Sequence, residues 1–237
     1  FVLGGGSNIL VSDEGFKGLV VKMEMKGVDF LGERVMVKAG ENWDELVDKC
    51  VAEGLYGIEN LSYIPGTVGA APVQNIGAYG SEVRDTVESV RVFDTTDGKF
   101  KDFTNFDCKF EYRDSLFKKS GGRYIIVSVV FLLKKEGKVN IEYRDLKEYF
   151  GDKKPTLAEV PNAVIEIRKR KLPDVKEVGT AGSFFKNPIV KRGVADDLKA
   201  KYPELPVYYV NDEVAKVSLA WIIDKVCNFK GVAKGDV

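Results

Sequence analysis

The residues best suited to hold a charged group lie in a stretch rich in small residues, from Tyr63 to Gly80, that contains no charged side chain. Glycine permits positive φ and a close approach of the backbone to another molecule. Backbone N–H groups at a helical turn, expected to open near Thr67, attract anions such as a pyrophosphate. A second glycine-rich segment, Gly4–Asn8, follows an apolar run and matches neither G-x-G-x-x-G nor a P-loop. The two segments favour a diphosphate site, while tightly packed structural turns remain the alternative.

The composition excludes several other kinds of site. The 237 residues contain no histidine, so a Ser-His or Cys-His nucleophile, a His-ligated metal and a cofactor tethered through imidazole are all ruled out. The three cysteines, Cys50, Cys108 and Cys227, show no metal-ligand spacing, and no metal site is predicted. Their odd number, together with the lack of a visible signal peptide, favours reduced thiols and a cytoplasmic location.

The charge and hydropathy patterns also limit the partners. Lys plus Arg equals Asp plus Glu, 36 of each, so no global field favours nucleic acid. No apolar run approaches the ~20 residues that cross a bilayer, so membrane insertion is not predicted. The sequence does not determine the oligomeric state, and a monomer is compatible with it.

Short strands and one helix are expected to position the glycine-rich segments. Asn42 is predicted to cap a helix that ends at Gly54 and buries Trp43 and Cys50 on one face. A strand over 124–133, rich in β-branched residues, is predicted to be central. Other strands are expected over 18–23, 28–31, 34–39, 87–94 and 99–103, the last two forming a hairpin through Asp97-Gly98. Strands, one helix and strands again predict an α+β fold.

The amino-acid composition and pattern change in the C-terminal third of the chain. Pro161-Asn162 is predicted to cap a helix whose basic end, Arg168–Lys171, complements the helix dipole. A domain boundary is expected just after this helix. Beyond it the pattern predicts helices over 196–202 and 217–226 and a strand over 207–210.

Four motifs in order resemble the UDP-N-acetylenolpyruvoylglucosamine reductase (MurB) family of flavoproteins. They are Leu3–Leu10, Ile64–Gly80, Tyr112–Ser115, and Lys171–Asp174 running into Ala181–Pro188. The resemblance implies a flavin-binding domain of two α+β subdomains over residues 1–172, similar to the vanillyl-alcohol oxidase (PCMH-like) flavoproteins. It also implies an insertion at about 134–160 within that domain, and a smaller α+β substrate-binding domain over 173–237.

The same resemblance implies noncovalent FAD between the subdomains and NADPH as the reductant. The absence of histidine agrees with a flavin that is not covalently attached. The residues implied to bind the cofactor are Gly4, Gly5, Gly6, Ser7, Asn8, Pro65, Gly66, Thr67, Val68, Gly69, Gln74, Asn75, Gly77, Ala78 and Tyr79.

The implied reaction reduces the enolpyruvyl ether of UDP-N-acetylglucosamine enolpyruvate to UDP-N-acetylmuramate, a peptidoglycan precursor. Ser183 matches the family's proton donor, and Arg113 matches the arginine that holds the substrate carboxylate. The residues implied to hold the UDP-sugar are Tyr143, Lys171, Asn187, Tyr208, Lys216 and Lys230, with Tyr143 in the loop typical of the family's longer form. Structural interpretations stay open: Ser183 as a strand hydroxyl, Lys171 as a helix end and Tyr143 as a surface aromatic.

One departure from the family bears on the prediction. The family's catalytic glutamate motif, near its C-terminus, has no match before Val237, and the opening strands of the first subdomain have no match after Phe1. The sequence therefore suggests a chain truncated at both ends. Two alternatives remain open: another flavin oxidoreductase of the same fold, or a catalytically impaired fragment that binds FAD or a UDP-sugar.

Overall fold

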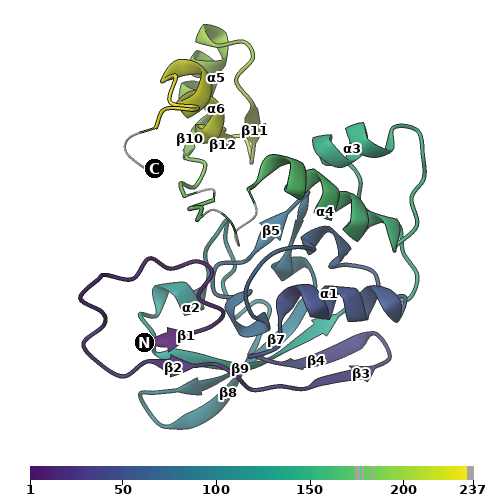
Figure 1. Cartoon of the computed structure of the whole chain (residues 1–237), viewed down its shortest axis with the longest axis vertical. Coiled ribbons are helices and arrows are strands. Elements are labelled where there is room, and N and C mark those ends of the chain that lie inside the picture. The colour runs from purple at the N-terminus through teal and green to yellow at the C-terminus, as the bar shows by residue number, and fades with distance from the viewer. Residues whose placement is uncertain (174–176, 178, 183, 234–237) are drawn as a thin grey trace. The chain divides into compact units, whose positions relative to one another are not determined.

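A five-stranded antiparallel sheet, in the order β3-β4-β9-β7-β8, forms the framework of the N-terminal part of the chain (Figure 1). The computed structural model describes residues 1–173, 177, 179–182 and 184–233. The strands are β3 (Val28–Leu31), β4 (Arg34–Lys38), β7 (Val87–Asp94), β8 (Lys99–Thr104) and β9 (Tyr124–Leu132). The prediction that the β-branched run of β9 lies at the centre of the sheet is confirmed.

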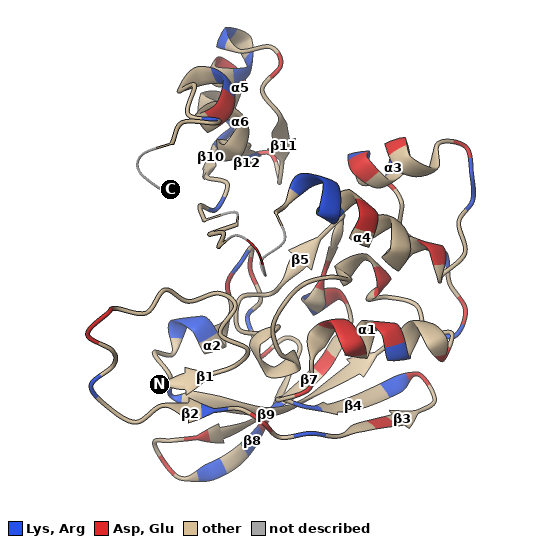
Figure 2. Cartoon of the chain, in the orientation of Figure 1, with Lys and Arg blue, Asp and Glu red and all other residues tan. Residues whose placement is uncertain are grey.

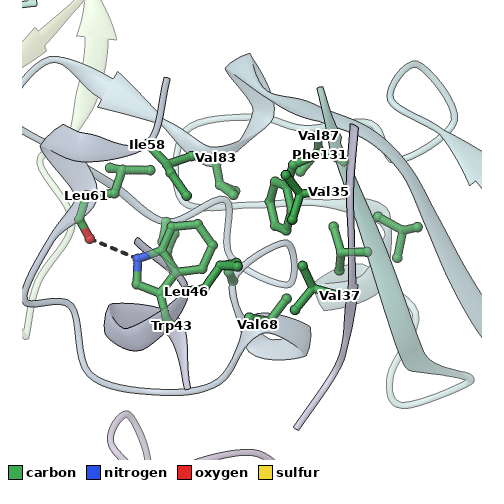
Figure 3. Packing of buried hydrophobic residues seen from close by; sticks show 14 of the residues in the cluster. Val35, Val37, Trp43, Leu46, Ile58, Leu61, Val68, Val83, Val87 and Phe131 are labelled. Atoms are coloured by element: carbon green, nitrogen blue, oxygen red, sulfur yellow. Dashed lines mark hydrogen bonds between the residues drawn. The ribbon is translucent and has the colours of Figure 1, made fainter. Parts of the chain in front are cut away.

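Helix α1 (Trp43–Ala52) packs against one face of this sheet (Figure 1). Asn42 caps it as predicted, since its side chain accepts a hydrogen bond from the Glu45 N–H at 3.1 Å. The Trp43 ring packs edge-on against Phe131 of β9, and its Nε1 donates to the Leu61 carbonyl at 2.8 Å (Figure 3). The buried bond fixes the chain just before the glycine-rich stretch begins.

The described part of the first unit, Phe1–Asp174, also contains two small pairs of strands, three 3-10 turns and three further helices. Strand β2 is only Val21–Lys22, shorter than predicted, and pairs in parallel with β1 (Val2–Leu3). The others are the hairpin of β5 (Gly77–Ala78) and β6 (Ser81–Glu82), the 3-10 turns Glu59–Leu61, Val68–Ala70 and Val83–Asp85, and helices α2 (Leu116–Lys119), α3 (Arg144–Phe150) and α4 (Glu159–Lys171).

Helix α4 begins earlier than predicted, so the assignment of its cap to Pro161-Asn162 was wrong. Glu159 accepts hydrogen bonds from the Thr156 N–H at 2.7 Å and hydroxyl at 2.9 Å, which pins the chain entering the helix. Proline is tolerated in a first turn because an N–H there has no partner within the helix. The basic end is present as predicted, and Figure 2 shows it in blue at the last turn of α4.

The second unit, Val175–Val237, contains a three-stranded antiparallel sheet in the order β10-β12-β11. The strands are β10 (Ile189–Lys191), β11 (Val207–Tyr209) and β12 (Val214–Val217), and helix α5 (Arg192–Lys201) starts before the predicted residue 196. The helix predicted over 217–226 is wrong at its start. Val217 ends β12, Ser218 caps α6 (Leu219–Trp221), and Ile222–Val226 continues as a π-helix. Among the described residues no helix has the length and apolarity to cross a bilayer.

Asp94 is fully buried at the end of β7, and its ionisation should make the free energy of unfolding depend on pH. Bonds from Arg123 at 2.7 and 2.9 Å and from Lys101 at 2.6 Å hold the pKa of its carboxyl well below the usual range. A carboxyl with a lowered folded pKa stabilises the fold above its unfolded pKa, about 3.9, and loses that contribution as the pH falls below it. We therefore expect Asp94→Asn to lower the urea midpoint at about pH 7 and to lower it less at about pH 3.

Urea denaturation of both proteins at the two pH values checks this expectation. The matched control is Asp102→Asn, which removes an exposed carboxyl 3.9 Å from Arg91 Nε and should change the midpoint little. A loss for Asp94→Asn that is equally large at both pH values would contradict the assignment.

Candidate functional site

The two glycine-rich segments, more than fifty residues apart in the sequence, meet at backbone distance. A Cβ on Gly5 would lie 3.1 Å from Gly66 Cα, and one on Gly4 would lie 2.8 Å from Thr67 Oγ1. Beside them, Asn8 Nδ2 donates to Gln74 Oε1 at 3.0 Å. Glycine is favoured at both positions, because an added side chain would meet the Gly66 backbone at Gly5 and the Thr67 and Ala70 side chains at Gly4.

The end of β4 and the start of α1 hold the second segment in place. Trp43 N–H donates to the Gly66 carbonyl at 3.1 Å, while the N–H groups of Val68 and Gly69 donate to Glu41 and Ala39 carbonyls, each at 2.9 Å. The 3-10 turn then starts directly after Thr67, at the predicted position. The loop is therefore anchored on the sheet and helix independently of any ligand.

The donors that remain available are fewer than the sequence suggested. Within the described part of the chain, the N–H groups of Gly5, Gly6, Gly66 and Thr67 donate to no protein acceptor, whereas those of Val68 and Gly69 are already used. Thr67 Oγ1 is buried and has no hydrogen-bond partner. An unsatisfied buried hydroxyl is costly. Together with a nest of unused N–H groups, it fits an anionic group such as a diphosphate.

The segments line a cavity of about 960 Å³, within the size range of small-molecule sites. One apolar wall comes from the N-terminal region and includes Phe16, Leu19 and Met23. Further lining comes from Phe117, Lys118, Gly121, Gly122 and residues 124–126, which no sequence motif predicts. The available signal was Gly121-Gly122, a glycine pair with φ of 61° and 88° just before β9.

Arg113 lies against the far end of the Tyr63–Gly80 stretch. Its Nη2 donates to the Gly77 carbonyl and its Nη1 to the Asn75 carbonyl at 3.4 Å. A Cβ on Gly77 would lie 2.8 Å from Nη1, so only glycine lets the guanidinium lie here. Arg113 also has a φ of 55°, unusual for a bulky residue and a kind of strain that clusters at functional sites.

Asn75 supports this arrangement from inside the protein. Its buried Nδ2 donates to Glu82 Oε2 at 2.9 Å and to the Glu111 carbonyl at 3.0 Å, and its Oδ1 accepts from the Arg84 N–H at 3.1 Å. The protein thus uses the whole side-chain amide. A role of Asn75 toward a cofactor would be to hold the loop that carries Gly77 and Ala78.

Tyr79, Tyr143 and Lys171 gather around α3 and α4. The Tyr79 ring is buried in a second apolar cluster with Leu146 of α3 and Val164 of α4, and burial raises the pKa of its phenol. The Tyr143 ring contacts it edge-on, with centroids 5.3 Å apart. Lys171 Nζ lies 2.6 Å from the Asp145 carboxylate. Three residues predicted for cofactor and substrate binding therefore share one region.

In the second unit, Tyr208 and Lys216 form a cross-strand pair between β11 and β12, with the lysine Nζ 5.5 Å from the ring centroid. Asn187 Oδ1 accepts from the Leu219 N–H at 3.0 Å, and Lys230 Nζ lies 3.9 Å from Asp224. Ser183 lies outside the described residues. In the described ranges, no three His, Cys, Asp or Glu side chains form a metal-binding group.

The contact between Gly5 and Gly66 gives a specific prediction. A valine at Gly5 would push the two segments apart, and overpacking of this kind costs about 1–3 kcal/mol. We expect Gly5→Val to weaken FAD binding roughly 10–100-fold. Titration of apoprotein with FAD measures the change. The control is Gly193→Val in α5, where an added Cβ meets nothing within 4 Å; equal FAD affinity in the two variants would refute the prediction.

Comparison with known proteins agrees with this geometry. Residues 1–104 match the FAD binding domain family. The UDP-N-acetylenolpyruvoylglucosamine reductase of Neisseria gonorrhoeae is 47% identical over 98% of this chain and 70% of its own length. That of Ralstonia nicotianae is 46% identical over 100% of this chain and 72% of its own length.

A solved structure gives the same result for the fold. The crystal structure of UDP-N-acetylenolpyruvylglucosamine reductase from Thermus caldophilus matches 98% of this chain and 81% of its own, with a TM-score of 0.57 and 23% sequence identity. The predicted α+β fold is thereby confirmed. With close sequence relatives over nearly its whole length, the chain belongs to the UDP-N-acetylenolpyruvoylglucosamine reductase family.

Proposed function

We propose that this protein binds FAD noncovalently and uses NADPH to reduce UDP-N-acetylglucosamine enolpyruvate to UDP-N-acetylmuramate. The observation that carries the proposal is the meeting of Gly4–Asn8 with Gly66 and Thr67 at backbone distance, where N–H groups are unused and a threonine hydroxyl is unsatisfied. The match of residues 1–104 to FAD binding domains supports the choice of anion.

The residues present fit a flavin dinucleotide. The N–H groups of Gly5, Gly6, Gly66 and Thr67, with the Thr67 hydroxyl, would hold the diphosphate without a basic side chain. The apolar walls of the cavity would cover the rings and exclude water. When bound, FAD supplies the means of accepting a hydride from NADPH and passing it to a carbon atom.

Arg113 would hold the carboxylate of the enolpyruvyl group. When a hydride reaches the methylene carbon, negative charge spreads onto the neighbouring carbon and the carboxylate. The planar, permanently charged guanidinium stabilises this charge by two parallel hydrogen bonds to the carboxylate. The carbonyl groups of Gly77 and Asn75 already orient the guanidinium. The arginine side chain therefore loses little conformational entropy when the substrate binds.

Ser183 would then donate a proton to the carbon next to the carboxylate and complete the reduction. A serine hydroxyl is a weak acid, but an enolate-like carbon is basic enough to take its proton if the two are held in position. The UDP part would be held by Tyr143, Lys171, Asn187, Tyr208, Lys216 and Lys230. We place this activity in the cytoplasm, in keeping with the three free cysteines.

Steady-state assay of the purified full-length protein tests the proposal. We expect NADPH oxidation only when the enolpyruvyl UDP-sugar is present, with UDP-N-acetylmuramate formed in equal amount. Peroxide production without the UDP-sugar would instead indicate an oxygen-using flavin oxidoreductase. Retained flavin with no turnover would indicate a binding protein.

A further inference from the structure

Asn60, in the 3-10 turn Glu59–Leu61, joins two segments that are distant in the sequence. Its side chain is 1% exposed. The Nδ2 group donates to the Tyr79 carbonyl at 2.8 Å and to the Asn140 carbonyl at 2.7 Å. An asparagine amide has two N–H donors, so each of the two segments takes one.

The two segments make weaker contacts with each other beside Asn60. Asn140 Nδ2 donates to the Gly80 carbonyl at 3.3 Å, and the Tyr79 and Tyr143 rings meet edge-on. A Cβ on Gly80, whose φ is +84°, would lie 3.8 Å from the Cβ of Tyr143. The end of the glycine-rich stretch and the segment with Tyr143 are therefore packed closely, and the buried Asn60 side chain is hydrogen-bonded to both.

Tyr79 is fixed from other sides as well. Its ring is part of the apolar cluster with Leu146 and Val164, and it contacts the Tyr143 ring edge-on. The turn that carries Asn60 is itself anchored by the bond from Trp43 to the Leu61 carbonyl. Asn60 thus connects two packed regions, the α1 core and the Tyr79 cluster, to the segment around Asn140.

We propose that Asn60 is a positioning residue for UDP-sugar binding. It fixes the position of Tyr143 relative to the glycine-rich stretch Tyr63–Gly80. This inference rests on the proposed function, in which Tyr143 binds the UDP-sugar. Asn60 is buried and reaches the ligand only through the two carbonyl groups it holds. Its loss weakens sugar binding and leaves the reduction of FAD by NADPH unchanged.

Asn105 offers a matched control. Its Nδ2 also bridges two backbone carbonyls, those of Arg84 at 2.8 Å and Val87 at 2.7 Å, but neither belongs to the segment of Tyr79 or to that of Asn140. In the full-length FAD-loaded protein, we expect Asn60→Ala to raise the Kd of the enolpyruvyl UDP-sugar about tenfold. Asn105→Ala should leave this Kd unchanged. The Kd is read from the change in flavin absorbance, and the rate of flavin reduction by NADPH is measured beside it.

A double-mutant cycle separates positioning from general damage. If Asn60 acts through Tyr143, the variant carrying both Asn60→Ala and Tyr143→Ala binds the UDP-sugar no more weakly than Tyr143→Ala alone. Additive losses overturn the proposal, and so does an unchanged Kd in folded Asn60→Ala. Should Asn60→Ala not fold, Asn60→Ser takes its place, because one hydroxyl donor can serve only one of the two carbonyl groups that the amide holds. It is expected to weaken sugar binding in the same direction, and an unchanged Kd in that variant overturns the proposal.

A ligand-free measurement distinguishes failure of this inference from failure of the proposed function. The segment from Lys134 to Lys147 contains several trypsin sites. We expect trypsin to cut there faster in Asn60→Ala than in Asn105→Ala, at concentrations of urea that equalise their global stability. Equal cutting overturns the role of Asn60. A wild-type protein that binds no UDP-sugar overturns the proposed function, whatever the cutting pattern.

Discussion

Replacing Arg113 with lysine should slow the oxidation of reduced flavin by the enolpyruvyl UDP-sugar by about 10²–10³-fold. Lysine keeps the charge but cannot give two parallel hydrogen bonds to a carboxylate. It also cannot keep both contacts to the Gly77 and Asn75 carbonyls that orient the guanidinium. The rate of flavin reduction by NADPH should change little, and stopped-flow absorbance measures the two half-reactions separately.

The control for this experiment is Arg91→Lys. Arg91 lies on β7 with its Cζ 5.6 Å from the Phe100 ring, and we assign it no role in the reaction. Both half-reactions should keep their rates in that variant. If Arg113→Lys slowed both half-reactions equally, the arginine would be placing the flavin and not the substrate carboxylate.

Replacing Ser183 with alanine should slow the same second half-reaction by about 10²–10⁴-fold, the range for loss of a general acid. NADPH reduction should again be nearly unchanged, because no proton from Ser183 is needed to reduce the flavin. Ser183→Cys keeps an acidic proton at this position and should restore part of the rate. Ser89→Ala on β7 is the control. Equal losses in both half-reactions, or no recovery with cysteine, would reject Ser183 as the proton donor.

Local patterns predicted the elements that depend on neighbouring residues. The i, i+3, i+4, i+7 spacing from Trp43 and the cap at Asn42 define α1, because both the spacing of the apolar residues and the capping bond lie within the helix segment itself. The alternation in β7 and β8 defines their hairpin for the same reason. In the candidate site, the glycine content of two segments indicated that the backbone itself approaches another group.

Features that depend on distant residues could not be predicted. Nothing near Val68 and Gly69 shows that their N–H groups are taken by Glu41 and Ala39, which leaves Gly66 and Thr67 as the available donors. Asn60 bonds to a carbonyl 80 residues away, and its neighbours in the sequence give no sign of this. The start of α4 was wrong because Pro161 was read as a boundary, while the bond from Thr156 to Glu159 sets it.

Anaerobic mixing of the NADPH-reduced full-length protein with UDP-N-acetylglucosamine enolpyruvate is the decisive experiment for the proposed reduction. We expect the absorbance of oxidised flavin to return without oxygen, with one UDP-N-acetylmuramate formed for each flavin oxidised. UDP-N-acetylglucosamine, which lacks the enolpyruvyl group, should leave the flavin reduced. A flavin that stays reduced with the enolpyruvyl sugar and becomes oxidised only when oxygen is admitted would contradict the claim.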